Sequence, residues 1–285
     1  MKNLRAAAIA GAAIAGLFLS SSAFSADVSS YLPAVSGING KIEFQGGPYT
    51  SDTFGGGMEW RGGATLSIPL EDRFGIQADI AAANTLNAGT AEGGALHLFT
   101  RDPNSYLLGL TGAAYWTGIG NGQLIGPEVE LYSGPVTFHA FAGYMNSSIA
   151  GVNTGTFFGI GNISYYANPN LALTVGAKDI NNFKTAHAGL EWQFSDTAPV
   201  AFTLDGKIGD DNYRAVDAGI RIYFGAGGKS LQRRHREDDP SNAAADVFNG
   251  AGSAFGDTGN TPTNCIPQTN VGPNAGPPPS KCIPL

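Results

Sequence analysis

The sequence has few charged residues, only two cysteines and, after its first 25 residues, no long apolar run. Charged residues make up 14% of the 285 residues, and 23 Asp and Glu outnumber 16 Lys and Arg. This acidic balance argues against nucleic acid as a partner, because phosphates attract basic surfaces. No later stretch approaches 18 consecutive apolar residues, so we expect no transmembrane helix.

The N-terminus has the pattern of a targeting segment. Lys2 and Arg5 precede a 14-residue apolar run, Ala6–Leu19, and small residues follow up to Ser25. This order predicts a secretory signal peptide over residues 1–25, cleaved after Ser25. The apolar run is too short to cross a bilayer as a helix. We therefore expect an exported protein whose mature chain keeps 14 basic and 23 acidic residues.

The composition and the order of side chains favour strands. The chain contains 41 glycines, 16 phenylalanines and 10 tyrosines, which suits many strands joined by turns. Apolar and polar residues alternate with a period of two, as in strands with one apolar and one polar face. This pattern predicts twelve strands between Ile38 and Phe224. The clearest are residues 58–70, 74–80, 187–194 and 200–208, whereas residues 157–166 mix apolar and polar side chains in both phases.

Proline marks the connections between the expected strands. Five prolines recur every 30 to 34 residues in or beside tight turns: Pro69, Pro103, Pro135, Pro169 and Pro199. Longer loops rich in Gly, Asn and Thr are expected over residues 46–57, 84–94, 118–126, 147–155 and 179–184, with a short one at 210–213. Short turns on one side and longer loops on the other are typical of a transmembrane barrel. Both ends of the sheet would lie on the turn side.

Two all-β architectures accommodate this pattern, a closed transmembrane barrel and a soluble β-sandwich. Aromatic girdles distinguish them, because barrels place aromatic residues at both membrane interfaces. The expected girdles comprise Trp60, Trp116 and Tyr144 near the loop ends and Phe74, Tyr106, Phe194, Phe202 and Phe224 near the turn ends. We therefore predict an all-β fold, an antiparallel transmembrane β-barrel of about 12 strands, over residues 26–224.

The last expected strand, Asp217–Phe224, has a signature of its own. Asp217, Gly219, Ile222 and Phe224 follow the order polar, glycine, apolar, aromatic. This order resembles the closing-strand signal of bacterial outer-membrane β-barrel proteins, which the barrel assembly machinery reads. Together with the signal peptide and the alternating strands, the resemblance to porin-like proteins covers about 190 residues. It implies a location in the cell outer membrane, in contact with outer-membrane lipid.

The polar phase of the strands places charged residues inside the expected barrel. The main lumen-lining candidates are Glu59, Arg61, Asp79, Glu128, Glu130, Glu191, Asp205 and Arg221, and the same phase adds Lys41, Glu43, Arg101, Lys178, Lys207 and Asp217. Twelve strands leave more room than the roughly eight whose interior side chains can fill. A water-filled pore with a slight acidic excess would favour cationic or neutral solutes. In the alternative, the lumen is plugged and the charges pair to stiffen the wall.

Three histidines, His97, His139 and His187, fall on the same polar phase. They lie on the fourth, seventh and tenth expected strands, and no pair has the close spacing of a zinc site. We interpret them as solvated lumen residues that are not neighbours around the wall. The strand phases bring together no Ser-His-acid set and no carboxylate pair. We therefore expect no metal, no cofactor and no enzymatic activity.

The residues from Gly225 to Leu285 differ in composition from the barrel. A charge run over Lys229–Asp239 leads into a segment rich in Gly, Asn, Pro and Thr. This composition predicts a largely disordered low-complexity extension, which would lie in the periplasm if the last strand ends on the turn side. Cys265 and Cys282 are expected to form a disulfide, with free thiols or an intermolecular bridge as alternatives. A periplasmic or cell-wall partner could bind there.

The resemblance implies location and architecture more directly than function. Our first interpretation is a passive channel for small solutes. The second is a structural or anchoring barrel with a plugged lumen, which binds partners through its loops or its periplasmic tail. Substitution of lumen charges separates the two, because it changes ion selectivity in a channel and only stability in an anchor.

Overall fold

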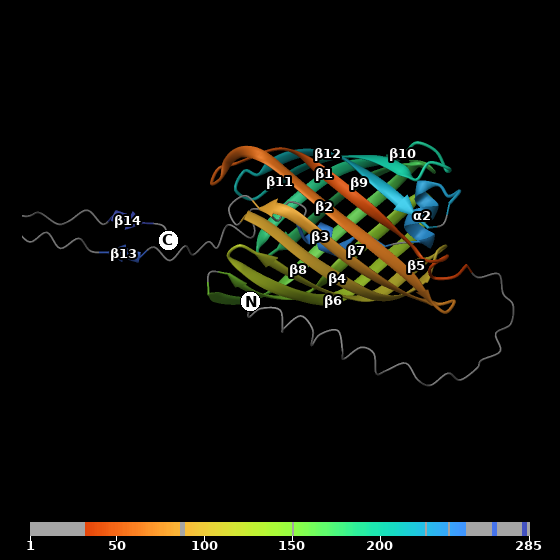
Figure 1. Ribbon diagram of the computed structural model, residues 1–285, viewed down its shortest axis with the longest axis horizontal. Helices are drawn as coiled ribbons and strands as arrows, with labels where there is room; N and C mark the ends of the chain where they lie inside the picture. The colour runs from red at the N-terminus through yellow and green to blue at the C-terminus, as the bar shows by residue number, and fades with distance from the viewer. Residues whose placement is uncertain are drawn as a thin grey trace, which may run out of the picture. The chain divides into compact units, whose positions relative to one another are not determined.

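Twelve antiparallel strands close into one barrel in the computed structural model (Figure 1). The structure describes residues 32–85, 89–149, 151–225, 227–238, 240–248, 264–266 and 281–283, so the predicted signal peptide lies outside the described residues. The strands of the barrel are β1 (Asn39–Ser51), β2 (Gly55–Leu70), β3 (Phe74–Thr85), β4 (Gly89–Asp102), β5 (Tyr106–Thr117), β6 (Gly120–Ser133), β7 (Val136–Ile149), β8 (Val152–Asn168), β9 (Leu171–Ile180), β10 (Phe183–Gln193), β11 (Val200–Gly209) and β12 (Arg214–Phe224). The predicted fold class and strand number are confirmed.

Each strand pairs with its neighbours in sequence, and β12 closes the barrel against β1. The closing register sets Phe224 opposite Gly40 and Arg221 opposite Glu43. Along β12 the apolar side chains of Val216, Ile220 and Ile222 face outward, because each is 42–53% exposed. A closed ladder leaves no unpaired sheet edge, which is the condition for placing a sheet in lipid.

The outer wall of the barrel is apolar and carries the expected aromatic girdles. Near one rim Trp116 and Tyr144 are each 48% exposed, and Trp60 is 38% exposed. Near the other rim the exposed aromatics are Phe74, Phe138, Tyr165, Trp192, Phe194, Phe202 and Phe224, and the predicted girdle residue Tyr106 is half-buried. Such an apolar outer surface is unfavourable in water and favourable in a lipid bilayer.

Connections at both rims are short, so the predicted asymmetry of short turns and long loops is wrong. At the rim where loops were expected, residues 118–119 join β5 to β6 and Asn181-Asn182 join β9 to β10. Asn181 and Asn182 have φ angles of 54° and 64°, the left-handed geometry of a two-residue hairpin turn. Such a turn matches the twist of paired strands, so the strands run through residues whose composition suggested loops. We call this rim the loop end, and the rim at which β1 begins and β12 ends the turn end.

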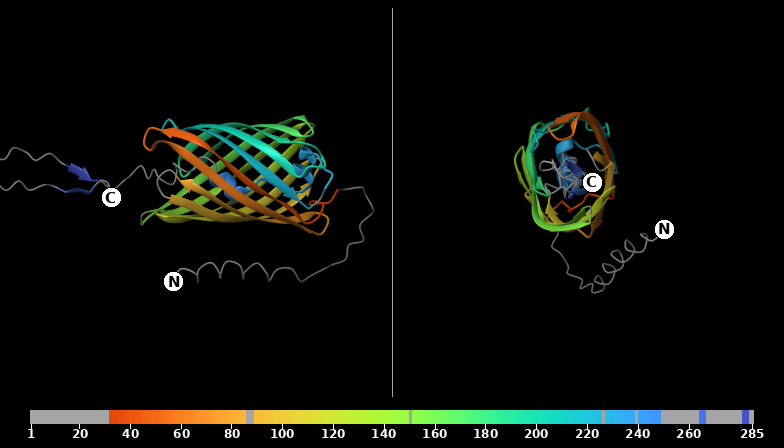
Figure 2. Two further views of the ribbon diagram at one scale, coloured as in Figure 1. Left: turned by 45° about the horizontal axis from the view of Figure 1, so that its top comes forward. Right: turned by 90° about the vertical axis from the view of Figure 1, so that its left-hand side faces the viewer.

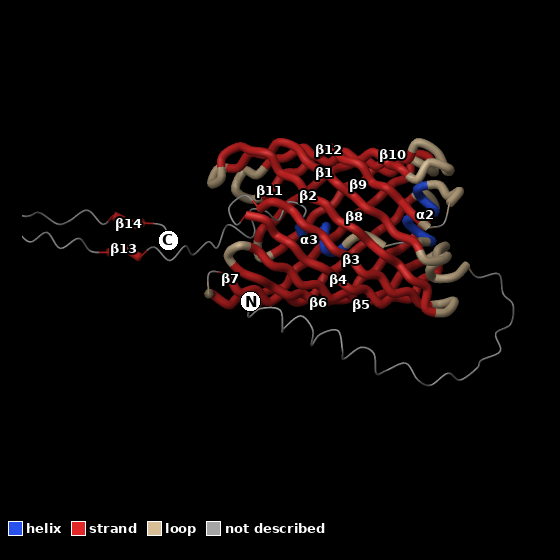
Figure 3. Tube along the Cα trace, viewed as in Figure 1, coloured by secondary structure: helices blue, strands red, loops and turns tan. Residues whose placement is uncertain are grey.

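Two helices lie inside the ring of strands, as the end-on view of Figure 2 and the tube in Figure 3 show. They are α2 (Leu231–Glu237) and α3 (Ala243–Phe248). Both fall in the segment predicted to be a largely disordered extension, so that prediction is wrong for residues 227–238 and 240–248. The charge run of α2 finds partners on the wall, and the apolar residues of α3 pack against β2, β3, β4 and β5. A low-complexity composition does not show that a segment will find such contacts inside a barrel.

Beyond α3, two short strands pair with each other. They are β13 (Asn264–Ile266) and β14 (Lys281–Ile283), antiparallel, with Cys265 directly opposite Cys282. Opposed residues in an antiparallel ladder have Cα atoms about 4.5–5.5 Å apart, within the range that a disulfide spans. The register is compatible with the predicted disulfide, which stays a prediction. Among the described residues, no helix is both long enough and apolar enough to cross a membrane.

Candidate functional site

The lumen is the candidate site, and the structure places all eight predicted lining residues on its inner wall. Seven of them are buried or nearly so: Arg61, Asp79, Glu128, Glu130, Glu191, Asp205 and Arg221. Glu59 is half-buried nearer the loop end of β2. The six further charged residues of the same phase, Lys41, Glu43, Arg101, Lys178, Lys207 and Asp217, also face inward. Period-two alternation on regular strands is enough to bring them together.

Two clusters, each centred on one cation, link strands β10, β11, β12, β1 and β2 across the lumen. Arg221 donates to Glu43 Oε2 from Nη2 at 2.5 Å and from Nε at 3.0 Å, and its Nη1 contacts Glu191. Lys207 donates to Glu59 Oε1 at 2.6 Å and also contacts Asp217. Each cation therefore bridges two carboxylates from different strands. Paired charges of this kind persist inside a protein because each offsets the desolvation of the other.

The three lumen histidines belong to one hydrogen-bonded chain. His97 Nδ1 lies 2.6 Å from Glu128 Oε2, and His139 Nε2 lies 3.2 Å from Glu128 Oε1. Asn162 bridges onward, with its Nδ2 at 3.4 Å from His139 Nδ1 and its Oδ1 at 3.0 Å from His187 Nε2. Asp79 and Asp205 end the chain at His97 and His187. The histidines are not on neighbouring strands, as predicted, but carboxylate and amide groups on intervening strands connect them. The prediction that they are solvated is wrong for His97 and His139, which are buried.

A glycine on β9 leaves room for the hydrogen bond between Asn162 and His187. Strand β9 separates Asn162 on β8 from His187 on β10, and Gly176 is the β9 residue between them. A Cβ at Gly176 would lie closer than van der Waals contact to both Asn162 Oδ1 and His187 Nε2. The absence of a side chain therefore lets two groups two strands apart form a direct hydrogen bond.

Toward the loop end the lumen is apolar along β5 to β8, whereas the Lys207 cluster occupies the loop-end part of β11 and β12. Inward-facing Tyr115, Leu124, Phe141, Met145 and Phe158 are each at most 4% exposed. They form one cluster with the small and apolar side chains of α3, which are Ala243, Ala244, Ala245, Val247 and Phe248. Phe248 packs edge-on against Tyr115 with ring centroids 6.5 Å apart. This half of the lumen is filled by side chains.

At the turn end α2 lies across the lumen and is attached to several strands. Its N-cap residue Ser230 precedes Leu231, whose backbone N–H donates to Asn170 Oδ1 at 3.0 Å. Arg236 donates to the Val136 carbonyl at 2.8 Å, and its guanidinium lies over the rings of Tyr132 and Tyr166. Contacts on several wall segments fix the helix in position.

The ends of the α2 segment are tied by charge. Lys229 Nζ donates to Asp238 Oδ1 at 2.5 Å and lies 3.2 Å from Glu237 Oε2. Arg233 donates to Glu237 Oε1 at 2.7 Å within the helix. Partial burial raises the pKa of Glu237, but the hydrogen bonds from Arg233 and Lys229 outweigh it, and the net pKa is lowered. Both partners belong to the α2 segment, so the carboxylate form of Glu237 stabilises the fold of this segment.

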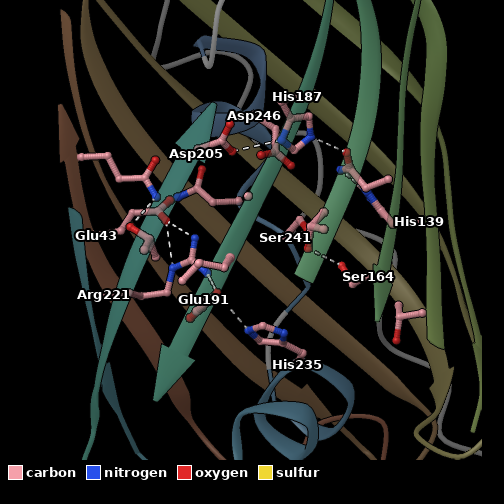
Figure 4. A pocket seen from close by; sticks show the side chains of 18 of the residues that line it. Glu43, His139, Ser164, His187, Glu191, Asp205, Arg221, His235, Ser241 and Asp246 are labelled. Atoms are coloured by element: carbon pink, nitrogen blue, oxygen red, sulfur yellow. Dashed lines mark hydrogen bonds and ion pairs between the residues drawn. The ribbon is translucent and has the colours of Figure 1, made fainter. Parts of the chain in front are cut away.

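We call residues 227–238 and 240–248 the lumen segment. A polar cavity of about 160 Å³ remains beside it (Figure 4). Its acidic lining residues are Glu43, Glu130, Glu191, Asp205 and Asp246, and its basic ones are Lys41, Arg61 and Arg221, with His139, His187 and His235 alongside. Buried Arg61 has two nitrogens, Nε and Nη1, without a hydrogen-bond partner among the described residues, and the same holds for Asp205 Oδ1. A buried donor or acceptor is costly without a partner, so water or a polar solute is the fitting occupant.

Carboxylates and histidines of the lumen are engaged with one another and with neighbouring hydroxyl groups. Ligand atoms of Glu128, Glu130 and His139 lie within 4.8 Å of one another and could hold a metal ion. Glu128, however, also accepts from Thr111 at 2.7 Å, and Glu130 accepts from Tyr132 at 2.6 Å. In the part of the chain that the structure describes, no serine hydroxyl contacts a histidine of the lumen chain. The set therefore acts as a hydrogen-bonded wall.

The barrel is closed, its outer wall is apolar with aromatic girdles, and its interior is charged. These features define a membrane-spanning β-barrel of the outer-membrane type. No family model matches the sequence. No curated protein matches it either.

Solved structures of a porin, an outer membrane channel and an outer membrane phospholipase have a similar backbone. A KdgM porin is 9% identical, with a TM-score of 0.47, and the match covers 65% of this chain and 99% of the porin. An outer membrane channel from Pseudomonas putida is 11% identical, with a TM-score of 0.49, over 70% of this chain and 100% of the channel. An outer membrane phospholipase dimer with bound calcium from Salmonella typhi is 10% identical, with a TM-score of 0.44, over 70% and 94%. The likeness concerns general architecture alone.

Proposed function

We propose that this chain is an outer-membrane channel for small polar solutes whose lumen is occupied at rest by its own residues 227–248. The observation that carries the proposal is the polar cavity, which lies beside the lumen segment and is lined by Arg61 and Asp205, each with a buried polar atom that has no hydrogen-bond partner among the described residues. Five acidic side chains against three basic ones supply the field for cationic or neutral solutes. Release of α2 and α3 from the wall would open the path.

The second candidate is a structural or anchoring barrel. The observation in its favour is the apolar cluster at the loop end, where Tyr115, Met145 and Phe158 close the lumen together with α3. In this role the charge clusters would serve only to stiffen the wall. Short connections at both rims leave little surface for binding through loops, so an anchoring barrel would bind through its C-terminal extension.

The proposed location is the outer membrane, with its lipid around the apolar wall. The strand Asp217–Phe224 has the closing position expected of an assembly signal, and Asp217, Gly219, Ile222 and Phe224 are the residues that the barrel assembly machinery would read. Phe224 and Ile222 face outward, 43% and 42% exposed, where a membrane-embedded partner could reach them. Substitution of Phe224 tests this through the yield of folded barrel.

Planar-bilayer conductance of the mature protein tests the channel proposal. Three forms are compared: the full mature chain, a chain ending after Gly225, and a chain ending after Phe248 as the matched control. We expect rare or small currents from the full chain and from the control, and steady currents from the chain ending after Gly225. Retention of the folded form on unheated gels checks that each barrel is intact.

Selectivity is measured on the conducting form from the reversal potential in a salt gradient. Glu130→Gln and Asp205→Asn together are expected to reduce cation preference, because both carboxylates line the cavity. Glu71→Gln, on an exposed turn, is the control and should leave the reversal potential unchanged. Silence of every form, with the barrels folded, would reject the channel and favour the anchoring role.

A further inference from the structure

We propose that the barrel carries its own C-terminus across the membrane, so that the chain beyond Phe248 leaves at the loop end and is presented on the side opposite to the turn end. The inference concerns the path of the described residues and does not depend on conduction. It also reverses the location expected for the extension, which the sequence analysis put on the turn side.

The segment starts at the turn end. There β12 ends at Phe224, and Gly225 follows with a φ of 96°, which reorients the chain. Ser36, just before β1, donates to Asp238 Oδ1 at 2.5 Å. Arg101, one residue from the turn end of β4, donates to the Asp238 carbonyl at 2.8 Å. Residue 238 therefore still lies at the turn-end rim.

The next residues lie progressively deeper. Lys41, two residues into β1, donates to the carbonyl of Pro240 at 3.0 Å. Asn242 Nδ2 donates to Thr65 Oγ1 at 3.1 Å, five residues from the turn end of β2. The backbone N–H of Ala243 donates to Asp79 Oδ2 at 2.7 Å, at the same depth on β3.

The last described residues of the segment lie near the loop end. Lys178, two residues from the loop end of β9, donates to the carbonyl of Asp246 at 2.8 Å. Phe248 packs on Tyr115, two residues from the loop end of β5. From Asp238 to Phe248 the wall partners thus move from one rim to the other without reversal. Figure 3 shows α3 farther from the turn end than α2.

The cavity beside the segment is too small for a return path to the turn end among the described residues. The cavity beside the segment measures about 160 Å³, close to the ~150 Å³ of an engineered cavity that accommodates one benzene-sized molecule. A second chain running back along α3 would need room for several residues at every level of the lumen. The described segment therefore ends at the loop end, with 37 residues of the sequence still to follow Phe248.

The geometry thus assigns the molecule a further function, presentation of a C-terminal segment. Residues 227–248 would serve both to occupy the lumen and to thread the chain through it. The presented part contains Cys265 and Cys282, the only cysteines of the chain. Whether oxidised or reduced, they would then lie on the loop-end side of the membrane.

Epitope mapping on intact cells tests the path. The same tag is placed after Leu285, between Asn181 and Asn182 at the loop end, or after Asp72 at the turn end, in three versions of the full chain. On intact cells, we expect the tag after Leu285 to be labelled whenever the tag at Asn181 is labelled. The tag after Asp72 should give the opposite result on intact cells. Labelling of the C-terminal tag together with the Asp72 tag would overturn the proposal.

A second measurement uses the unmodified chain and removes the risk that a tag disturbs folding. Intact cells are treated with a broad-specificity protease, and the remaining protein is measured by mass spectrometry. We expect loss of residues after 248 with retention of the barrel. An intact C-terminus on intact cells, together with its loss after permeabilisation, would overturn the proposal. Because neither readout involves current, a failed channel proposal leaves this result interpretable.

Discussion

The two halves of the lumen differ in how they are stabilised. In the turn-end half, charged side chains such as Arg221, Glu43 and Glu191 form ion pairs across strands. In the loop-end half, Tyr115 on β5 and Met145 on β7 pack with α3 as in a protein core, and the Lys207 cluster is confined to the side of β11 and β12. Inward-facing positions of the barrel strands supply both the ion-paired and the apolar side chains. Facing the lumen therefore does not mean facing water.

Each half is matched by the helix that lies in it. The helix α2 contains the charged run, and it reaches the wall at the turn end through the ion pair of His235 with Glu191 and through cation–π contacts of Arg234 and Arg236. The helix α3 has the sequence Ala-Ala-Ala-Asp-Val-Phe and fills the apolar half. A six-residue helix is too short to be stable by itself in water, so α3 depends on this packing. The match indicates that residues 227–248 belong to the barrel.

The largest expected effect comes from breaking a charge cluster. Arg221→Ala leaves Glu43 and Glu191 without their shared cation inside the lumen, which should reduce the free energy of unfolding by about 3–5 kcal/mol. Urea unfolding in lipid vesicles measures it, with the fluorescence of lipid-facing Trp60, Trp116 and Trp192 as the signal. Arg73→Ala, on an exposed turn, is the control and should change little. An unchanged midpoint for R221A would mean that the cluster does not stabilise the wall.

A smaller effect is expected in the apolar half, confined to the lumen segment. Phe248→Ala removes a ring that is 5% exposed and contacts Tyr115, which should weaken docking of α3 by about 3 kcal/mol. Hydrogen exchange of the Asp246 amide, which donates to the Asn242 carbonyl at 2.9 Å, reports that docking.

The control for this substitution is Phe157→Ala, which removes a 79% exposed ring on the lipid side. It should leave the exchange rate of Asp246 unchanged, because Phe157 does not reach the lumen. Equal exchange in F248A and the parent chain would show that α3 is held by its hydrogen bonds to the wall, such as that of Ala243 to Asp79, and not by the apolar cluster.

The sequence was sufficient to predict the barrel, its twelve strands and the inward position of the charges. Strict alternation in strands such as β2 and β12 carries that information, since a register slip would turn every side chain to the other face. The short connections were missed, because Asn and Gly mark tight hairpin turns as well as loops. Strand β8 contained the missed signal: Phe158 and Ile160 are inward and apolar, whereas Asn162 and Ser164 on the same phase are polar. The mixed phase that made this strand ambiguous marks the boundary between the two halves.

The lumen segment could not be predicted from local sequence. Nothing in Leu231–Glu237 alone shows that Arg236 would lie over Tyr132 and Tyr166, which are 104 and 70 positions earlier in the sequence. The histidine chain was missed for the same reason, because its bridging groups, Glu128 and Asn162, lie on strands between those that carry the histidines. Contacts between distant segments depend on closure of the barrel, which only the tertiary structure reveals.

The smallest expected effect concerns pH and the charged half alone. The pKa of Glu237 is lowered when α2 is docked, so docking gains stability above the pKa of the undocked carboxyl, about 4.3, and loses it as pH falls through the lowered value. The i,i+4 pair with Arg233 lies within α2 and contributes about 0.5 kcal/mol. Because so short a helix does not persist undocked, loss of the pair should change the ratio of docked to undocked segment roughly twofold. Single-channel open probability between pH 6 and pH 3 measures that ratio.

Glu237→Gln isolates this contribution from the other carboxyl groups that titrate in the same range. The variant keeps the size of the side chain but cannot change charge, so its open probability should rise less steeply on acidification than that of the parent chain. Lys229 also loses a partner in this variant, but it keeps Asp238 at 2.5 Å, and the segment should stay docked at neutral pH. Identical pH profiles for both proteins would mean that Glu237 does not hold α2 and that the turn-end half is fixed by its contacts to the strands, foremost those of Arg236 with Val136 and Thr137.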